Sequence, residues 1–287
     1  MSLNYDGFLS DPGNFTPPDD VLALDGGDLG AGGIRAGLYL PDEPVQAVLI
    51  FHHGGGASRQ GYGGLADAVR RRAPVAVLVP DLRGHGDSAG ARGFAATPEA
   101  VWADVDRLVD TVRARWPGAA VFVGGHSSGG GLVVNWASRR PGGGGDLAGV
   151  VLLAPMLSGA RSGFATARTW VFLAYLFSGR RLMAHAAAVR FAYPPAMASE
   201  RRLVEAYSPG MSLAVTPRHA GAAIERIVAP ILMLAAADDE LFDAPGLRAA
   251  AGPATFGVVA GSHLSCLIPG AGPIAGFIGR RLEPPAR

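Results

Sequence analysis

Long apolar runs without polar alternation recur along the chain, and segments with helical spacing separate them. The runs cover residues 21–27, 34–41, 47–55, 75–84, 119–125, 148–155, 229–240 and 254–263. Each run is rich in aliphatic residues and is bounded by Gly, Pro or Asp, as is typical of β-strands. Because strands of this kind are buried on both faces, we expect a mostly parallel sheet that is built from right-handed crossovers.

Segments with helical periodicity alternate with these runs, at residues 62–72, 97–118, 131–140, 243–252 and 273–282. In the clearest of them, Thr97 is placed to cap the N-terminus, Pro98 takes the first helical position and Glu99 favours the positive end of the helix dipole. Its predicted buried stripe consists of Val101, Val105, Leu108, Val112 and Trp116. Helices that alternate with strands place the chain in the α/β class.

The alternation is interrupted between residues 156 and 228, where helix-like pieces and prolines occur without a convincing strand. We therefore predict one α/β core, formed by residues 1–155 and 229–287, that carries a mainly helical insertion over residues 156–228. In open α/β sheets, ligands bind at the carboxyl ends of the strands. We expect the insertion to form a cap over that edge.

Composition narrows the range of functions. With 287 residues and 49% hydrophobic content, the chain can bury one substantial core. The 25 Lys and Arg residues nearly balance the 24 Asp and Glu residues, and no basic stripe stands out, so nucleic acid is not an expected partner. Every basic residue is Arg, which excludes a phosphate-binding loop because that motif requires Lys.

The single cysteine, Cys266, cannot form an internal disulfide, and the first fifteen residues lack the basic and apolar regions of a secretory signal. These features favour a reducing cytoplasm. The apolar run at 169–177 is about half of the roughly 20 residues that cross a bilayer, so no transmembrane segment is predicted. With neither a basic partner nor a helix N-terminus evident nearby, Cys266 is interpreted as a core residue rather than a nucleophile.

The stretch GHSSGG, residues 125–130, lies between a predicted strand and a predicted helix. It contains the pattern G-x-S-x-G, in which a strained strand-to-helix turn exposes a serine hydroxyl and tolerates only small flanking residues. In a chain with 42 glycines the pattern alone also fits a simple turn. Its position between strand and helix favours Ser127 as a nucleophile, with the following helix N-terminus stabilising negative charge.

A serine nucleophile needs a histidine base and an orienting carboxylate. With this type of turn, the order along the chain is Ser, then Asp or Glu, then His. After Ser127, one predicted strand leads into Asp238 and Asp239, and the next leads into His263. All three groups therefore emerge at the carboxyl ends of strands, on one edge of the sheet.

Three segments together resemble the α/β-hydrolases of the monoacylglycerol lipase and lysophospholipase type, a group similar to the S33 serine aminopeptidases. They are HHGGGASRQGYGGLA at 52–66, DLRGHGDS at 81–88 and GHSSGG at 125–130. The resemblance extends from about residue 40 onward and is weakest in the insertion. It implies an oxyanion hole formed by the backbone N–H groups of Gly55 and Ser128. Matching the segment DELFD to the family's acid favours Asp239 over its neighbour Asp238.

Other candidate residues have simpler interpretations. His52 and His53 are expected to be structural, because no metal-ligand spacing accompanies them. His85 is expected to make hydrogen bonds within its loop, and His126, the variable position of G-x-S-x-G, is also expected to be structural. Five aromatic residues in the insertion either line an acyl pocket or attach the insertion to the core: Trp170, Phe172, Tyr175, Phe177 and Phe191.

These residues predict a serine hydrolase that cleaves a small-molecule carboxylic ester with an apolar acyl or alcohol part. Ser127 is the expected nucleophile, His263 the base and Asp239 its orienting acid, and no metal or organic cofactor is needed. A thioesterase or an acyltransferase would use the same triad. A binding protein that keeps this fold without chemistry is a third alternative, which the presence of all three triad types disfavours.

Overall fold

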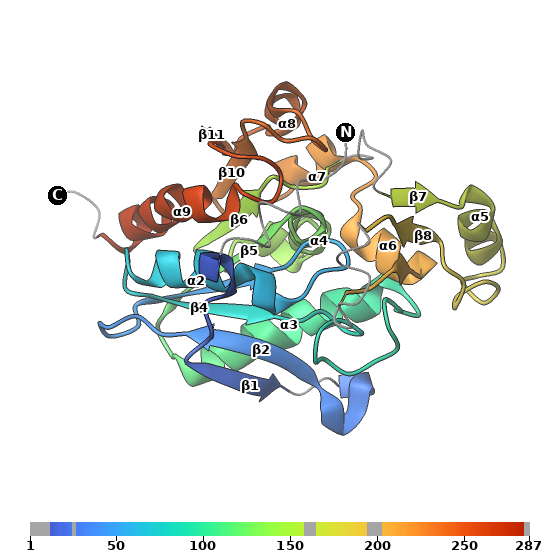
Figure 1. Cartoon of the computed structure of the whole chain (residues 1–287), viewed down its shortest axis with the longest axis horizontal. Helices are drawn as coiled ribbons and strands as arrows, with labels where there is room; N and C mark the ends of the chain where they lie inside the picture. The colour runs from blue at the N-terminus through green and yellow to red at the C-terminus, as the bar shows by residue number, and fades with distance from the viewer. Residues whose placement is uncertain (1–11, 25–26, 158–164, 194–202, 284–287) are drawn as a thin grey trace.

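The computed structural model describes residues 12–24, 27–157, 165–193 and 203–283. An eight-stranded sheet forms its centre, in the order β1-β2-β4-β3-β5-β6-β10-β11 (Figure 1). The strands are β1 (Asp20–Leu24), β2 (Ile34–Tyr39), β3 (Ala47–His52), β4 (Val75–Pro80), β5 (Ala120–His126), β6 (Gly149–Leu153), β10 (Ile231–Ala236) and β11 (Thr255–Val259). From β4 to β11 all neighbours are parallel, whereas β1 and β2 pair antiparallel at one edge.

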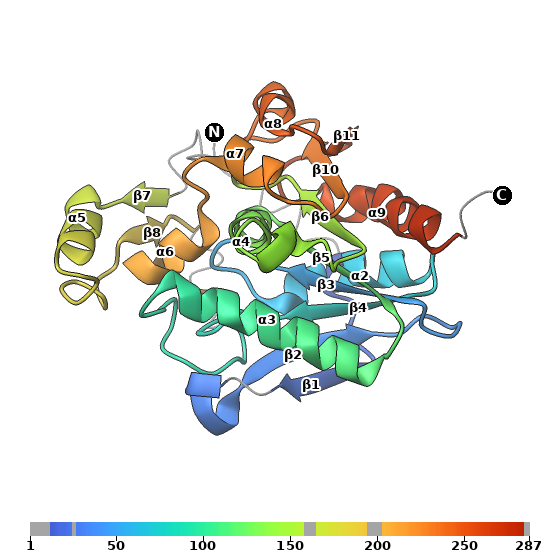
Figure 2. The ribbon, with the colours of Figure 1, turned by 180° about the vertical axis from the view of Figure 1, so that it is seen from behind.

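Helices cover both faces of this sheet, which confirms the predicted fold class. The helices of the core are α2 (Gly63–Arg70), α3 (Pro98–Arg115), α4 (Ser128–Ala137), α8 (Ala244–Ala250) and α9 (Leu267–Leu282). Helices α2 and α9 pack on one face, and α3, α4 and α8 pack on the other (Figure 2). Alternate residues of β3 serve the two cores, since Val48 and Ile50 face α3 and α4 while Leu49 and Phe51 face α2 and α9.

The predicted helix at 97–118 forms as α3, and four of its five predicted stripe residues are fully buried, with Trp116 half-buried at the end. Thr97 is the N-cap residue, but its hydroxyl makes no capping bond to the backbone. The position of the cap was predictable from the sequence, but the capping hydrogen bond does not form.

The insertion between β6 and β10 differs from the expectation, because it contains a small antiparallel sheet in the order β7-β8-β9. Its elements are β7 (Ala165–Ala167), α5 (Thr169–Phe177), β8 (Val189–Phe191), β9 (Ala206–Tyr207), α6 (Pro209–Val215) and α7 (Ala220–Glu225). Helix α5 ends at Phe177, and Val189–Phe191 is a strand in a stretch for which no strand was predicted. Residues 158–164 and 194–202 of the predicted insertion lie outside the described residues.

The small sheet, α5 and α6 lie together at one end of the molecule (Figure 1). None of the described helices combines the length and apolar character that a membrane crossing requires.

Candidate active site

Ser127 occupies a strained turn between β5 and α4. Its backbone has φ 54° and ψ −121°, a conformation that residues other than glycine rarely adopt. The turn is held on both sides, because the Ser127 N–H donates to the Leu153 carbonyl at 3.1 Å and its carbonyl accepts from the Gly131 N–H at 3.1 Å. The strained strand-to-helix turn predicted from GHSSGG is therefore present.

The flanking glycines are required by the packing of this turn. A Cβ atom at Gly125 would overlap the backbone of Gly129. A Cβ atom at Gly129 would lie 2.5 Å from the carbonyl oxygen of His52, at the end of β3. Because neither backbone can move without disturbing the central sheet, the elbow excludes every side chain at these two positions, as the sequence pattern predicts.

Three side chains from separate strand ends meet at Ser127. The Nε2 atom of His263 lies 2.9 Å from the Ser127 Oγ, and its Nδ1 atom lies 2.9 Å from the Asp239 Oδ2. Because an ionised carboxylate can only accept, the proton is assigned to Nδ1, which leaves Nε2 to accept from the serine hydroxyl. The side chains of His263 and Asp239 are 2% and 0% exposed, so water competes little for these bonds.

Asp239, and not Asp238, contacts the imidazole. Its other carboxylate oxygen accepts from the backbone N–H groups of Leu241 and Phe242, at 2.8 and 2.9 Å. Burial alone would raise the pKa of the Asp239 carboxyl, but the hydrogen bond and charge of His263, with these backbone bonds, hold that pKa below its ordinary value. Asp238 is exposed to solvent.

Glu240 also holds the imidazole loop, which the sequence reasoning missed. Its Oε2 accepts from the backbone N–H of His263 at 2.9 Å. The sequence contained an indication of this contact, because Glu240 follows the two aspartates directly. Without coordinates, a role for Glu240 could not be distinguished from that of an ordinary acidic loop residue.

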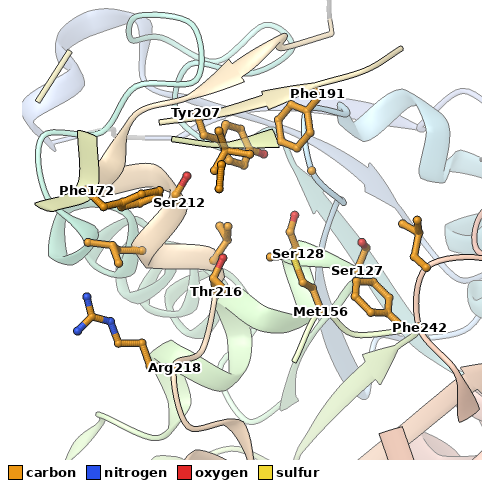
Figure 3. A pocket seen from close by; sticks show the side chains of 16 residues that line it. Ser127, Ser128, Met156, Phe172, Phe191, Tyr207, Ser212, Thr216, Arg218 and Phe242 are labelled. Atoms are coloured by element: carbon orange, nitrogen blue, oxygen red, sulfur yellow. The ribbon is translucent and has the colours of Figure 1, made fainter. Parts of the chain in front are cut away.

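The predicted oxyanion donors lie beside Ser127. Ser128 is the first residue of α4, and a Cβ atom added to Gly55 would be 3.4 Å from the Ser128 Oγ. Both residues line the same cavity as Ser127 (Figure 3). Neither of their backbone N–H groups donates a hydrogen bond to another part of the chain that the structure describes. The arrangement suits a bound oxyanion, and this role stays a prediction.

This cavity has a volume of about 340 Å³ and a largely apolar lining (Figure 3). Of the five predicted aromatic residues, Phe172 and Phe191 line it. Tyr175 does not, because it is buried and its hydroxyl donates to the Ala96 carbonyl at 2.7 Å, which attaches the insertion to the core. Trp170 and Phe177 do neither, since they are 52% and 88% exposed.

The sequence reasoning missed most of the remaining apolar lining: Met156, Val189, Leu213, Val215, Leu241 and Phe242. Leu241 and Phe242 follow Asp239 after a single intervening residue, Glu240, so their position close to the acid was a usable signal. Val189, on β8, and Leu213 and Val215, on α6, depend on how the insertion folds, which their spacing does not reveal.

Cys266 is buried, and its thiol donates to the His263 carbonyl at 3.2 Å. The expectation that no helix N-terminus lies near it was wrong, because Cys266 is the N-cap residue of α9. Burial nevertheless raises the pKa of the thiol, and the charge of Asp239 adds to this effect. The thiol therefore stays protonated, and its interpretation as a core residue holds. Among the described residues, no group of three His, Cys, Asp or Glu side chains could hold a metal ion.

Four histidines predicted to be structural are fully buried near the carboxyl ends of the strands. Burial lowers the pKa of His52 and of His126 to about 3, and it also lowers the pKa of His53 and His85. These imidazoles are neutral in the folded chain. His126 accepts from the Tyr62 hydroxyl, whereas neither ring nitrogen of His52 has a hydrogen bond with the described residues.

We therefore expect the chain to lose stability in mild acid. Between about pH 6.5 and pH 3 the unfolded chain binds protons at His52 and His126 and the folded chain does not, so the free energy of unfolding falls as the pH falls. Each of these two histidines contributes about 1.4 kcal/mol per pH unit in this window. Urea denaturation at about pH 7.5 and pH 5 measures the slope.

His52→Leu provides the matched control, because it removes one titrating group without breaking a hydrogen bond to the described residues. Its stability should fall less steeply with decreasing pH than that of the wild-type chain. Equal slopes for the two proteins would contradict this explanation.

Comparison with known proteins places the chain in a family. The family model described as serine aminopeptidase, S33, matches residues 43–255, which is more than half of the chain. The chain is a member of the serine aminopeptidase S33 family. One relative is human monoglyceride lipase, with which 119 residues of the chain align at 32% identity. This match covers 42% of the chain and 38% of that enzyme.

Two solved structures share the fold of this S33 member. The monoacylglycerol lipase of Paleococcus ferrophilus aligns over 86% of the chain and 99% of its own, with TM-score 0.67 and 21% identity. A thermostable carboxyl esterase from Bacillus coagulans aligns over 92% of the chain and 99% of its own, with TM-score 0.66 and 16% identity. These similarities confirm the α/β-hydrolase fold.

Proposed function

We propose that this S33-family chain is a serine hydrolase that cleaves a small carboxylic ester with an apolar acyl or alcohol part. The observation that carries the proposal is the position of His263, whose two ring nitrogens lie 2.9 Å from Ser127 and 2.9 Å from Asp239. This contact is made next to a largely apolar cavity. The similarity to human monoglyceride lipase over part of the chain supports an ester as the substrate.

The geometry supports an acyl-enzyme mechanism. The Ser127 Oγ attacks the ester carbonyl carbon while its proton passes to Nε2 of His263. The Asp239 carboxylate holds Nδ1–H and stabilises the imidazolium that forms. The N–H groups of Gly55 and Ser128 stabilise the oxyanion. The proton on Nε2 then passes to the leaving alcohol oxygen as the carbon–oxygen bond breaks, and the acyl group stays on Ser127.

Hydrolysis of the acyl-enzyme reverses these proton transfers. His263 takes a proton from water, the resulting hydroxide attacks the acyl carbon, and the proton returns to the Ser127 oxygen as the carboxylic acid leaves. The insertion, residues 156–228, acts as a cap that covers the apolar acyl or alcohol part through Phe172 and Phe191.

A lone buried thiol, Cys266, suits a reducing cytoplasm.

We expect the wild-type chain to hydrolyse p-nitrophenyl esters and to be labelled by a fluorophosphonate probe. A series of esters of increasing acyl length should show kcat/KM rising with apolar length until the cavity is filled. Matched acyl-thioesters provide the comparison.

Turnover of thioesters without turnover of oxygen esters would replace the ester function by a thioesterase. Transfer of the acyl group to an added alcohol in preference to water would indicate an acyltransferase. A folded protein that is never labelled would contradict catalysis and favour a binding protein.

A further inference from the structure

The two residues on either side of Gly55 are held by tyrosine hydroxyls. The Gly54 N–H donates to the Tyr62 hydroxyl at 2.7 Å, and the Gly56 N–H donates to the Tyr207 hydroxyl at 2.8 Å. Both residues of each bond are buried, so water does not replace these bonds. Gly55 itself, between them, lines the cavity, and its N–H has no such partner in the described chain.

Each tyrosine hydroxyl is in turn fixed by a buried histidine. Tyr62 lies 2.9 Å from Nδ1 of His126, and Tyr207 lies 3.0 Å from Nε2 of His85. The opposite ring nitrogens face backbone carbonyls, of His263 at 2.8 Å and of Arg83 at 3.0 Å. Carbonyls only accept, so the protons are assigned to those opposite nitrogens. Each tyrosine then donates its hydroxyl proton to the histidine and accepts the glycine N–H.

A third histidine fixes the peptide group that carries the Gly55 N–H. The carbonyl oxygen of Gly54 accepts from Nδ1 of His53 at 2.9 Å and from the Ala57 N–H at 3.2 Å. His53 is held at its other ring nitrogen by the Leu82 N–H at 3.0 Å. Because the peptide bond is planar, fixing the Gly54 carbonyl also fixes the direction of the Gly55 N–H.

We propose that His53 and the two tyrosine–histidine pairs, Tyr62–His126 and Tyr207–His85, form a positioning frame that aims the Gly55 N–H at the oxyanion. This inference rests on the proposed function, because it assigns these residues to the same reaction. They are positioning residues, since they act through the backbone of the loop. The Tyr62–His126 pair also reaches the carbonyl of His263, so one buried chain of hydrogen bonds joins the oxyanion loop to the general base.

The second pair makes the frame depend on the insertion. Tyr207 belongs to β9 of the small sheet, and the nearby Val204 N–H donates to the Gly56 carbonyl at 2.8 Å. The insertion therefore holds Gly56 at both its N–H and its carbonyl. The oxyanion loop is complete only when the insertion is docked on the core.

The test uses two substrates that differ at the atom the oxyanion hole binds. One is a p-nitrophenyl ester, and the other is its thiono analogue, in which sulfur replaces the carbonyl oxygen. Sulfur is a weak hydrogen-bond acceptor, so the thiono ester depends less on the Gly55 N–H. We expect Tyr62→Phe and Tyr207→Phe to lower kcat for the oxygen ester by about 10-fold to 100-fold, and to lower the oxygen-to-thiono ratio of kcat/KM by about 10-fold.

Another buried tyrosine, in the core, supplies a matched control. The hydroxyl of Tyr39 donates to the backbone carbonyl of Thr16, away from the oxyanion loop. Tyr39→Phe should lose a comparable hydrogen bond and keep the wild-type ratio. A purely structural role would lower the melting temperatures of all three variants and leave the ratio unchanged in each.

If Tyr62→Phe does not fold, a second pair of variants tests the same hydrogen-bonded pair. His126→Gln keeps a donor and an acceptor and should retain the wild-type ratio, whereas His126→Leu should lose it. An unchanged ratio in folded Tyr62→Phe and Tyr207→Phe overturns the frame, and a loss confined to Tyr62→Phe overturns the part of Tyr207. A wild-type chain that hydrolyses neither ester instead overturns the proposed function, so the two failures are distinguishable.

Discussion

The Ser127→Ala variant is expected to hydrolyse a p-nitrophenyl ester about 10⁶-fold more slowly than the wild-type chain. The variant retains the backbone N–H groups around the cavity but has no oxygen to form the acyl-enzyme. Its remaining rate comes from substrate binding and from the oxyanion donors. Alanine fits the space of the serine, so the elbow should fold with its glycines unchanged.

Steady-state kinetics and fluorophosphonate labelling, with circular dichroism as the check on folding, measure this effect. Ser138→Ala is the matched control, because Ser138 is equally buried at the other end of α4, where its hydroxyl donates to the Asn135 carbonyl and accepts from the Arg139 guanidinium. The control should keep the wild-type kcat and be labelled fully. A folded Ser127→Ala protein that is still labelled would show that another residue is the nucleophile.

Replacing Asp239 by asparagine should lower kcat by about 10⁴-fold while KM changes little. The amide nitrogen of asparagine donates to Nδ1 of His263, which moves the ring proton to Nε2, the atom that must accept from Ser127. The shape of the site is retained, so the loss appears in the chemical step. The pH dependence of kcat/KM should change as well, because the carboxylate no longer stabilises the imidazolium.

Asp238→Asn is the paired measurement for this prediction. Asp238 is exposed, and the hydrogen bond to His263 is made by Asp239, so the kcat of Asp238→Asn should stay close to that of the wild-type chain. A large loss in Asp238→Asn with little loss in Asp239→Asn would reverse the assignment of the acid.

The core and the triad could be predicted because each depends on a strong local pattern. Strands such as β3 and β5 are apolar on both faces, which marks a parallel sheet buried between helices. Parallel strands bring their carboxyl ends to one edge, so residues that follow β5, β10 and β11 had to lie near one another. The glycines around Ser127 then indicated which serine to propose as the nucleophile.

The insertion could not be predicted in the same way, because its strands are too short to show a period. Strand β8 has three residues and β9 has two, and β8 follows an apolar stretch that also suits a helix. Their pairing joins residues that are 16 to 26 positions apart, which no local pattern records. The sequence also did not show which aromatic side chains point into the cavity and which point into solvent. Phe172, which lines the cavity, and Phe177, which is exposed, were therefore equivalent candidates.

Because the insertion hydrogen-bonds to Gly56, replacing it by the corresponding segment of another family member should disturb the oxyanion loop. Gly56 has φ +68°, and a side chain there would meet the Val204 carbonyl at 2.6 Å. A chimaera that receives a foreign insertion loses the partners that Val204 and Tyr207 provide for this glycine. New specificity is therefore more accessible by changing single lining residues, such as Leu213, than by transplanting the whole module.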